Sequence, residues 1–163
     1  LLDDLHISKQ MQRVINKNEF SFTLDTDFSC VIHACANAKR NEQDGTWITK
    51  DMIAAYCKLH DLGYAHSIEV WKNDKIVGGI YGVSLGKSFF GLSMFHTESN
   101  ASKFAFIKLV EILKSKQFHF LDAQVFTEHV ATLGAKDIDR KDFINRLENS
   151  LQHESWIGKW TIV

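Results

Sequence analysis

Hydrophobic residues recur at helical spacing in five stretches of the chain. From Phe28 to Cys35 they fall at positions i, i+3, i+4 and i+7, the pattern of a helix that buries one face. Ser8 and Thr49 are suitable N-caps for two of the other stretches, and Gly63 stands where a left-handed C-terminal residue is needed. The pattern predicts helices over residues 6–18, 25–40, 49–63, 100–116 and 140–151.

Apolar runs rich in β-branched and aromatic residues lie between these helices. The dipeptides Asn73-Asp74 and Leu85-Gly86 are short enough to join three of the runs into an antiparallel meander. The expected strands cover residues 20–24, 66–72, 75–85, 87–96, 118–126 and 156–163, and a polar loop is expected over 37–46. This order predicts an α/β (α+β) protein with a mixed, largely antiparallel sheet flanked by helices. Acyltransferases of the GNAT type show the same order.

Composition narrows the class of protein. A chain of 163 residues that is 45% hydrophobic can bury one substantial core, so one main domain is expected. Its formal charge of -1 excludes a global field that would attract nucleic acid or an anionic membrane. Three cysteines and the scattered histidines show neither CxxC nor metal-ligand spacing, which argues against a disulfide framework or a zinc site. We expect a protein of the reducing cytoplasm without a membrane span.

The GNAT-like order suggests an acyl-coenzyme A enzyme, and one segment tests this suggestion. GNAT acetyltransferases hold the pyrophosphate of coenzyme A on a glycine-rich turn that opens a helix. The corresponding segment here, TESNASK at 97–103, contains no glycine. A coenzyme A-dependent acetyltransferase is therefore disfavoured, and we expect no cofactor.

Several blocks of the sequence resemble the leucyl/phenylalanyl-tRNA–protein transferase family. They include QDGTWIT (43–49), LGYAHSIEVW (62–71), IVGGIYGVSLG (76–86) and LDAQV (121–125). The resemblance implies transfer of leucine or phenylalanine from aminoacyl-tRNA to the N-terminal amine of a protein, which marks that protein for degradation by the N-end rule. It also implies a GNAT-like catalytic domain over 25–163, with 1–24 as the remnant of, or linker from, a small N-terminal domain. A monomer is expected.

Asp122 and Gln124 match the family's Asp-x-Gln catalytic pair. If residues 118–126 form one strand, the two side chains point to the same face, about 6.5–7 Å apart along the backbone. The implied role of Gln124 is to accept a hydrogen bond from the incoming amine, while Asp122 orients the amide. The alternative is a polar pair that closes a hydrogen-bond network within the sheet.

The same resemblance implies an apolar pocket for the donor amino acid. Its candidate lining residues are Ile80, Met94, Leu109, Leu113 and Leu121, with Trp47 and Tyr56 placed near the 3′-terminal adenosine of the tRNA. A methionine suits a pocket that accepts both leucine and phenylalanine, because its thioether is flexible. Each of these side chains is also an ordinary candidate for the hydrophobic core.

One position departs from the family. Leu92 replaces a glutamate that, in the family, lies in an acidic cleft for an N-terminal arginine or lysine, and a leucine cannot pair with either cation. Two further readings follow from this change. The protein could have altered acceptor specificity, or it could bind aminoacyl-tRNA or peptide N-termini without catalysing transfer.

Overall fold

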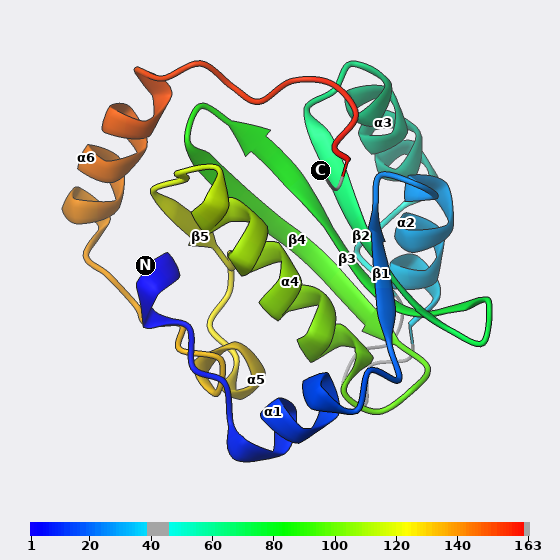
Figure 1. Cartoon of the computed structure of the whole chain (residues 1–163). Coiled ribbons are helices and arrows are strands. Elements are labelled where there is room, and N and C mark those ends of the chain that lie inside the picture. Colours follow the sequence, from blue (N-terminus) through cyan, green and yellow to red (C-terminus); the bar gives the residue numbers. More distant parts are fainter. Residues whose placement is uncertain (39–45, 162–163) are drawn as a thin grey trace.

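A five-stranded sheet forms the centre of the computed structural model, which describes residues 1–38 and 46–161 (Figure 1). Its strands follow the chain in the order β1-β2-β3-β4-β5, and all neighbours are antiparallel except β4 and β5, which are parallel. The strands are β1 (Ser21–Leu24), β2 (Ala65–Lys72), β3 (Lys75–Leu85), β4 (Ser88–His96) and β5 (Phe120–Asp122). The mixed, largely antiparallel sheet is as predicted.

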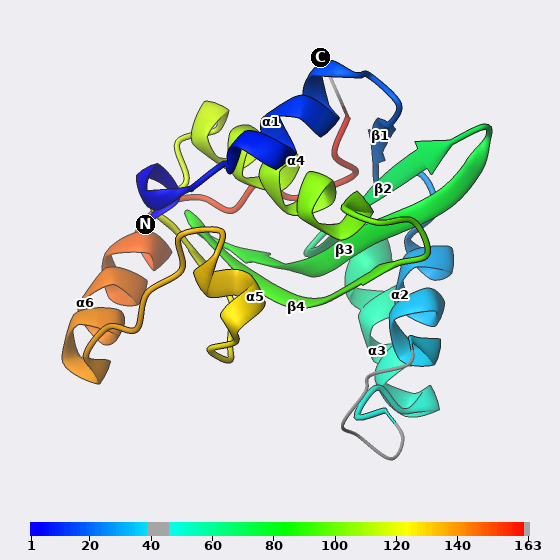
Figure 2. The same ribbon diagram turned by 90° about the horizontal axis from the view of Figure 1, so that it is seen from below.

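Helices cover both faces of this sheet. They are the 3₁₀ helix η1 (Leu2–Asp4) and the α-helices α1 (Lys9–Asn16), α2 (Phe28–Asn37), α3 (Lys50–Asp61), α4 (Ala101–Ser115), α5 (Glu128–Ala131) and α6 (Arg140–Leu151). Figure 2 shows α1 and α4 on one face and α2 and α3 on the other. Most of the polar loop expected over 37–46 lies outside the described residues. No helix in the described ranges combines the length and the apolar character that crossing a bilayer requires.

N-cap hydrogen bonds and turn residues determine where several helices and strands begin or end. The hydroxyls of Ser8 and Thr49 accept hydrogen bonds from backbone N–H groups in the first turns of α1 and α3, which confirms both predicted caps. Asn73 and Asp74 have positive φ angles of 50° and 58° and form the two-residue turn between β2 and β3. The next turn, at residues 86–87, lies one residue later than predicted.

Each face of the sheet has its own hydrophobic core. The larger core lies between α4 and the sheet and includes Ile68, Phe89 and Trp160, together with Leu2 and Met11 from the N-terminal segment. A second core packs α2 and α3 against the opposite face. Because β1 also pairs with β2, residues 1–24 contribute to both the sheet and the larger core. The domain boundary at residue 24 stays a prediction.

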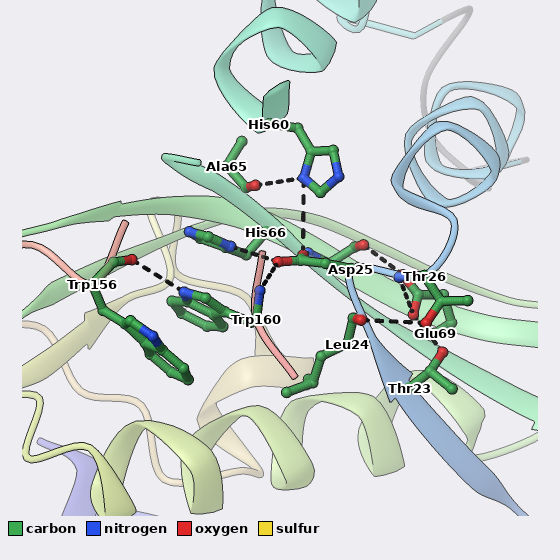
Figure 3. Close-up of polar contacts among 11 residues, drawn as sticks. Thr23, Leu24, Asp25, Thr26, His60, Ala65, His66, Glu69, Trp156 and Trp160 are labelled. Atoms are coloured by element: carbon green, nitrogen blue, oxygen red, sulfur yellow. Dashed lines mark hydrogen bonds and ion pairs between the residues drawn. The ribbon is translucent and has the colours of Figure 1, made fainter. Parts of the chain in front are cut away.

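A final strand is expected over residues 156–163. This expectation is wrong up to Thr161, because residues 154–161 form neither helix nor strand. The backbone N–H of Trp160 donates to the Asp25 carboxylate at 2.7 Å, so it is not available to a neighbouring strand. The fully buried Trp160 ring stacks on His66 at 3.8 Å and on Trp156 at 4.3 Å between ring centroids. Residue 160 is therefore anchored to the start of the fold by a contact across 135 positions (Figure 3).

Two buried carboxylates organise this end of the sheet. Asp25 follows β1 with a positive φ of 49° and also accepts from the backbone N–H of Ser67 and from the His66 ring, both at 2.8 Å. Glu69 accepts from the hydroxyls of Thr23 and Ser67. Burial raises the pKa of Glu69, although these hydrogen bonds act in the opposite direction.

Candidate active site

The segment after β5 turns sharply, so the predicted strand over 118–126 is wrong beyond Asp122. Gln124 has a φ of 66°, in the left-handed region, and its side chain does not share a strand face with Asp122. The cause is local: the Asp122 carboxylate accepts a hydrogen bond from the backbone N–H of Gln124 at 2.8 Å. Aspartate commonly bends the chain in this way two residues on.

Asp122 and Gln124 are nevertheless paired. The side-chain amide nitrogen of Gln124 lies 2.9 Å from the second carboxylate oxygen of Asp122. Because an ionised carboxylate can only accept, the amide must present its NH₂ group to Asp122. The Gln124 carbonyl oxygen is then directed elsewhere, and it has no hydrogen-bond donor within the described part of the chain.

This geometry carries a local conformational cost. A non-glycine residue held in the left-handed region costs roughly 1–3 kcal/mol. The two hydrogen bonds to the Asp122 carboxylate offset that cost and fix both the backbone and the side chain of Gln124. A strained, doubly held residue whose acceptor oxygen remains available is typical of a positioned functional group.

A cavity of about 290 Å³ lies beside the pair, which forms part of its lining. Its walls come from η1, α4, β5, the segment 123–138 and α6, which Figure 1 shows on the same side of the molecule. The apolar lining includes Leu2, Leu5, Phe106, Val110, Phe120, Leu121, Val130, Leu133 and Phe143. An apolar cavity of about 150 Å³ can hold benzene, so this volume is sufficient for an aliphatic or aromatic amino-acid side chain.

Sequence reasoning missed most of these apolar walls. Phe106 and Val110 are four positions apart on α4 and therefore share a helix face, a signal that was readable in the sequence. The sequence pattern marks α4 as apolar over a wide arc, but it does not tell which part of the arc faces a cavity. Which part of α4 faces the cavity depends on α6, whose Phe143 packs edge-on against Phe120, with ring centroids 5.9 Å apart.

Of the predicted donor-pocket residues, Leu121 lines the cavity. Ile80, Leu109 and Leu113 are instead buried in the core between α4 and the sheet, with exposed fractions of 2%, 1% and 0%. Met94 is half-buried against the same core. The structure therefore does not bring these four residues to the cavity wall, and their binding role stays a prediction.

The remaining predicted site residues lie with the α2 and α3 face. Trp47 precedes α3 and is 41% exposed. Tyr56 packs against Tyr81, with ring centroids 5.6 Å apart, and Leu92 is half-buried against the same core. None of the three lines the described cavity, and their assignment to the tRNA end and the acceptor cleft also stays a prediction.

Other kinds of chemistry find little support in the described ranges. Across 1–38 and 46–161, no three His, Cys, Asp or Glu side chains gather closely enough to hold a metal ion. Cys57 is half-buried, and burial together with the nearby Asp61 charge raises the pKa of its thiol. A raised pKa keeps this thiol protonated and poorly nucleophilic at neutral pH.

Comparison with solved structures identifies the fold. A protein from Clostridium acetobutylicum described as a predicted acetyltransferase, solved with acetyl-CoA, superposes with a TM-score of 0.52 over 74% of this chain and 92% of that chain. The sequence identity is 11%, so the likeness concerns the fold alone. The fold class is that of GNAT acetyltransferases, which confirms the prediction from element order.

Comparison with sequences identifies the family. A family model described as leucyl/phenylalanyl-tRNA protein transferase matches residues 1–148. A leucyl/phenylalanyl-tRNA–protein transferase from Syntrophus aciditrophicus is 49% identical over 98% of this chain, and one from Solidesulfovibrio magneticus is 46% identical over 97%. The chain spans 66% and 64% of the lengths of these two relatives. It belongs to the leucyl/phenylalanyl-tRNA protein transferase family.

Proposed function

We propose that the protein transfers leucine or phenylalanine from aminoacyl-tRNA to the N-terminal amine of an acceptor protein. Family membership supports the reaction class. The observation that carries the proposal is the Gln124 amide, which Asp122 holds beside an apolar cavity with its carbonyl oxygen free to accept.

The chemistry requires positioning more than activation. The acyl ester of an aminoacyl-tRNA is already reactive, and its conversion to an amide is downhill. A C–N bond forms as the ester C–O bond breaks, and the tRNA 3′-terminal hydroxyl leaves with a proton that the amine gives up. An α-amino group has a pKa of about 7.7–8.0, so a useful fraction is neutral at physiological pH.

Gln124 is suited to aim that neutral amine. Its carbonyl oxygen accepts a hydrogen bond from the amine and directs the nitrogen lone pair toward the ester carbonyl. The Asp122 carboxylate fixes the amide through its NH₂ group. Its negative charge also favours the positive charge that develops on the attacking nitrogen. Because glutamine does not take up a proton, this role is positioning with electrostatic assistance.

The cavity is suited to the donor side chain. Leu121, Phe106 and Phe120 give it an apolar wall next to the pair, and its volume of about 290 Å³ fits leucine or phenylalanine. Apolar walls of this kind discriminate weakly between the two, because one methylene in a hydrophobic pocket is worth only about 1–3 kcal/mol. We propose charged tRNA as the donor, a protein N-terminus as the acceptor, and the cytoplasm, where both occur, as the location, with the protein acting as a monomer.

The test measures transfer of labelled phenylalanine and leucine from charged tRNA to a peptide. We expect Gln124→Ala and Asp122→Ala each to lower the transfer rate by at least tenfold, because each removes the fixed acceptor of the amine. Gln10→Ala is the matched control, since Gln10 is exposed on α1 and does not line the cavity. Full transfer by both cavity variants would overturn the mechanism, and no transfer by the unsubstituted protein would overturn the function.

A further inference from the structure

Helix α6 forms one wall of the cavity but packs sparsely against the rest of the protein. Of its twelve residues, all of them described, only Ser150 is buried, whereas α4, which forms another wall, buries nine of fifteen. The exposed fractions of Ile144 and Leu151 reach 36% and 49%. Figures 1 and 2 both show α6 at the rim of the molecule, to one side of the sheet. An element with so few buried contacts opens at a lower free-energy cost than the core does.

The C-terminal end of α6 is fixed to the turn between β3 and β4. The Ser150 carbonyl accepts a hydrogen bond from the backbone N–H of Lys87 at 3.0 Å, and the Ser150 hydroxyl lies 2.9 Å from Nδ1 of His119. Gly86 has a φ of 56°, and a Cβ atom there would lie 2.2 Å from the Ser150 carbonyl oxygen, so the two backbones approach closely. Ser150 is therefore the point at which α6 is attached to the sheet.

The rest of the helix lacks such attachments. In the described part of the chain, no hydrogen bond or ion pair joins residues 137–149 to another helix or strand. The Arg146 guanidinium donates to Asp142, which belongs to the same helix. The contact with the sheet is made by the Phe143 ring, which packs against Phe120 at 5.9 Å between centroids. A single aromatic contact is easier to break than the hydrogen bonds at Ser150.

Phe143 is placed to move when α6 turns about Ser150. It lies seven residues before Ser150, a distance of roughly 10 Å along an α-helix, so a rotation of about 20° displaces it by about 4 Å. Phe143 and Phe120 both line the cavity, and Phe120 is followed by Leu121 and Asp122. Such a turn therefore opens or closes the apolar wall beside the Asp122 carboxylate.

We propose that α6 is a lid over the cavity and that it closes Phe143 onto the donor side chain. This inference rests on the proposed function, because it takes the cavity as the site of the leucine or phenylalanine side chain. The open lid admits that side chain. The closed lid covers it with Phe143, while Phe120 and Leu121 contact it from the sheet. Closure adds apolar contact that the open cavity lacks, so it raises the affinity for the donor.

Hydrogen exchange of backbone amides tests the motion. The probe is phenylalanyl-adenosine with its ester replaced by an amide, so that no transfer takes place. In the free protein, we expect the amides of α6 to exchange about tenfold faster than those of α4, or more. With the probe at about ten times its dissociation constant, exchange in α6 should slow by about tenfold, because the open state does not bind the probe. Helix α2, on the opposite face of the sheet, is the control and should exchange at an unchanged rate.

Steady-state kinetics test the residue. Phe143→Ala should raise the KM for phenylalanyl-tRNA by about tenfold with a smaller change in kcat, because it removes apolar contact with the bound donor. Phe143→Leu should recover most of this loss, since leucine also closes the cavity with an apolar side chain. Ile144→Ala is the matched control, because Ile144 is the next residue of α6, is 36% exposed and does not line the cavity.

The outcomes separate the lid from the reaction. If the amides of α6 exchange as slowly as those of α4, or if the bound probe does not protect them, the inference is overturned while the proposed function stands. The same holds if Phe143→Ala keeps the KM of the control. A probe that does not bind would also overturn the inference, because the cavity would not be the donor site. If the unsubstituted protein transfers nothing but the probe still protects α6, the lid stands and the transfer reaction does not.

Discussion

The buried carboxylate of Asp25 allows a stability prediction whose size follows from its contacts. It accepts hydrogen bonds from three nitrogens at 2.7–2.8 Å, namely the backbone N–H groups of Ser67 and Trp160 and the His66 ring (Figure 3). Ser67 donates to one carboxylate oxygen, whereas Trp160 and His66 contact the other. In Asp25→Asn, an NH₂ group replaces one of these oxygens.

Either orientation of the new amide leaves a buried donor without an acceptor. The NH₂ group faces the N–H of Ser67 in one orientation and the N–H of Trp160 in the other. A buried, unsatisfied donor costs about 1–3 kcal/mol, and the loss of negative charge weakens the remaining bonds, so we expect a total of about 2–4 kcal/mol. A domain of this size is stable by only about 5–15 kcal/mol, so the effect is large.

Urea denaturation followed by tryptophan fluorescence measures this difference. With a slope of about 2 kcal/mol per molar urea, the midpoint should fall by about 1–2 M. Asp27→Asn is the matched control, because Asp27 caps α2 at an exposed position and asparagine is an equally good N-cap. If Asp25→Asn unfolds at the same urea concentration as the control, the reasoning about this network is refuted.

Three further predictions concern stability and the cavity. Burial raises the pKa of Glu69, so the unfolded chain ionises this group at a lower pH than the folded chain. The free energy of unfolding should therefore fall, relative to that of Glu69→Gln, as pH rises through about 4.5 and above. If urea titrations show a difference between the two proteins that does not depend on pH, this prediction is contradicted. Gly134→Ala should destabilise the protein by more than about 2 kcal/mol, because its Cβ would meet the Asp4 carbonyl, and an unchanged melting temperature would disprove that close approach. Leu121→Ala should lower kcat/KM for both donors by about tenfold through lost apolar contact, whereas the exposed Leu62→Ala should not; equal values for the two variants would remove Leu121 from the donor pocket.

Features that depend on neighbouring residues were predictable from the sequence. The caps at Ser8 and Thr49 and the turn at Asn73-Asp74 follow from hydrogen bonds and backbone angles that a few adjacent residues determine. The layered order of helices and strands followed from hydrophobic periodicity, which is also a local property.

The end of β5 also depends on neighbouring residues, but there a side-chain hydrogen bond overrides the alternation of apolar and polar positions. Residues 118–126 alternate well enough to predict a continuous strand, yet the Asp122 carboxylate bends the backbone at Gln124. The alternation pattern reports which residues prefer burial and does not register a side chain that bonds to its own backbone two residues on. Asp122 and Gln124 are therefore hydrogen-bonded to each other, but on a backbone that differs from the predicted strand, and their catalytic role stays a prediction.

Long-range contacts were out of reach of the sequence pattern. The sequence pattern predicts that Trp160 is part of a strand, but its backbone N–H donates a hydrogen bond to Asp25, near the other end of the chain. The cavity likewise combines Leu2, Phe106, Phe120 and Phe143, which lie on four separate elements. No periodicity within one element indicates which of its apolar residues will line a space that other elements enclose.

A double-mutant cycle on Asp122 and Gln124 tests the central claim most directly. The claim is that Asp122 acts through the amide that it holds, so the two residues form one functional unit. Single-turnover rates of phenylalanine transfer from charged tRNA to a peptide are measured for Asp122→Ala, Gln124→Ala and the double variant. The account predicts that the double variant is no slower than the slower single variant. Losses in rate that multiply independently would contradict it.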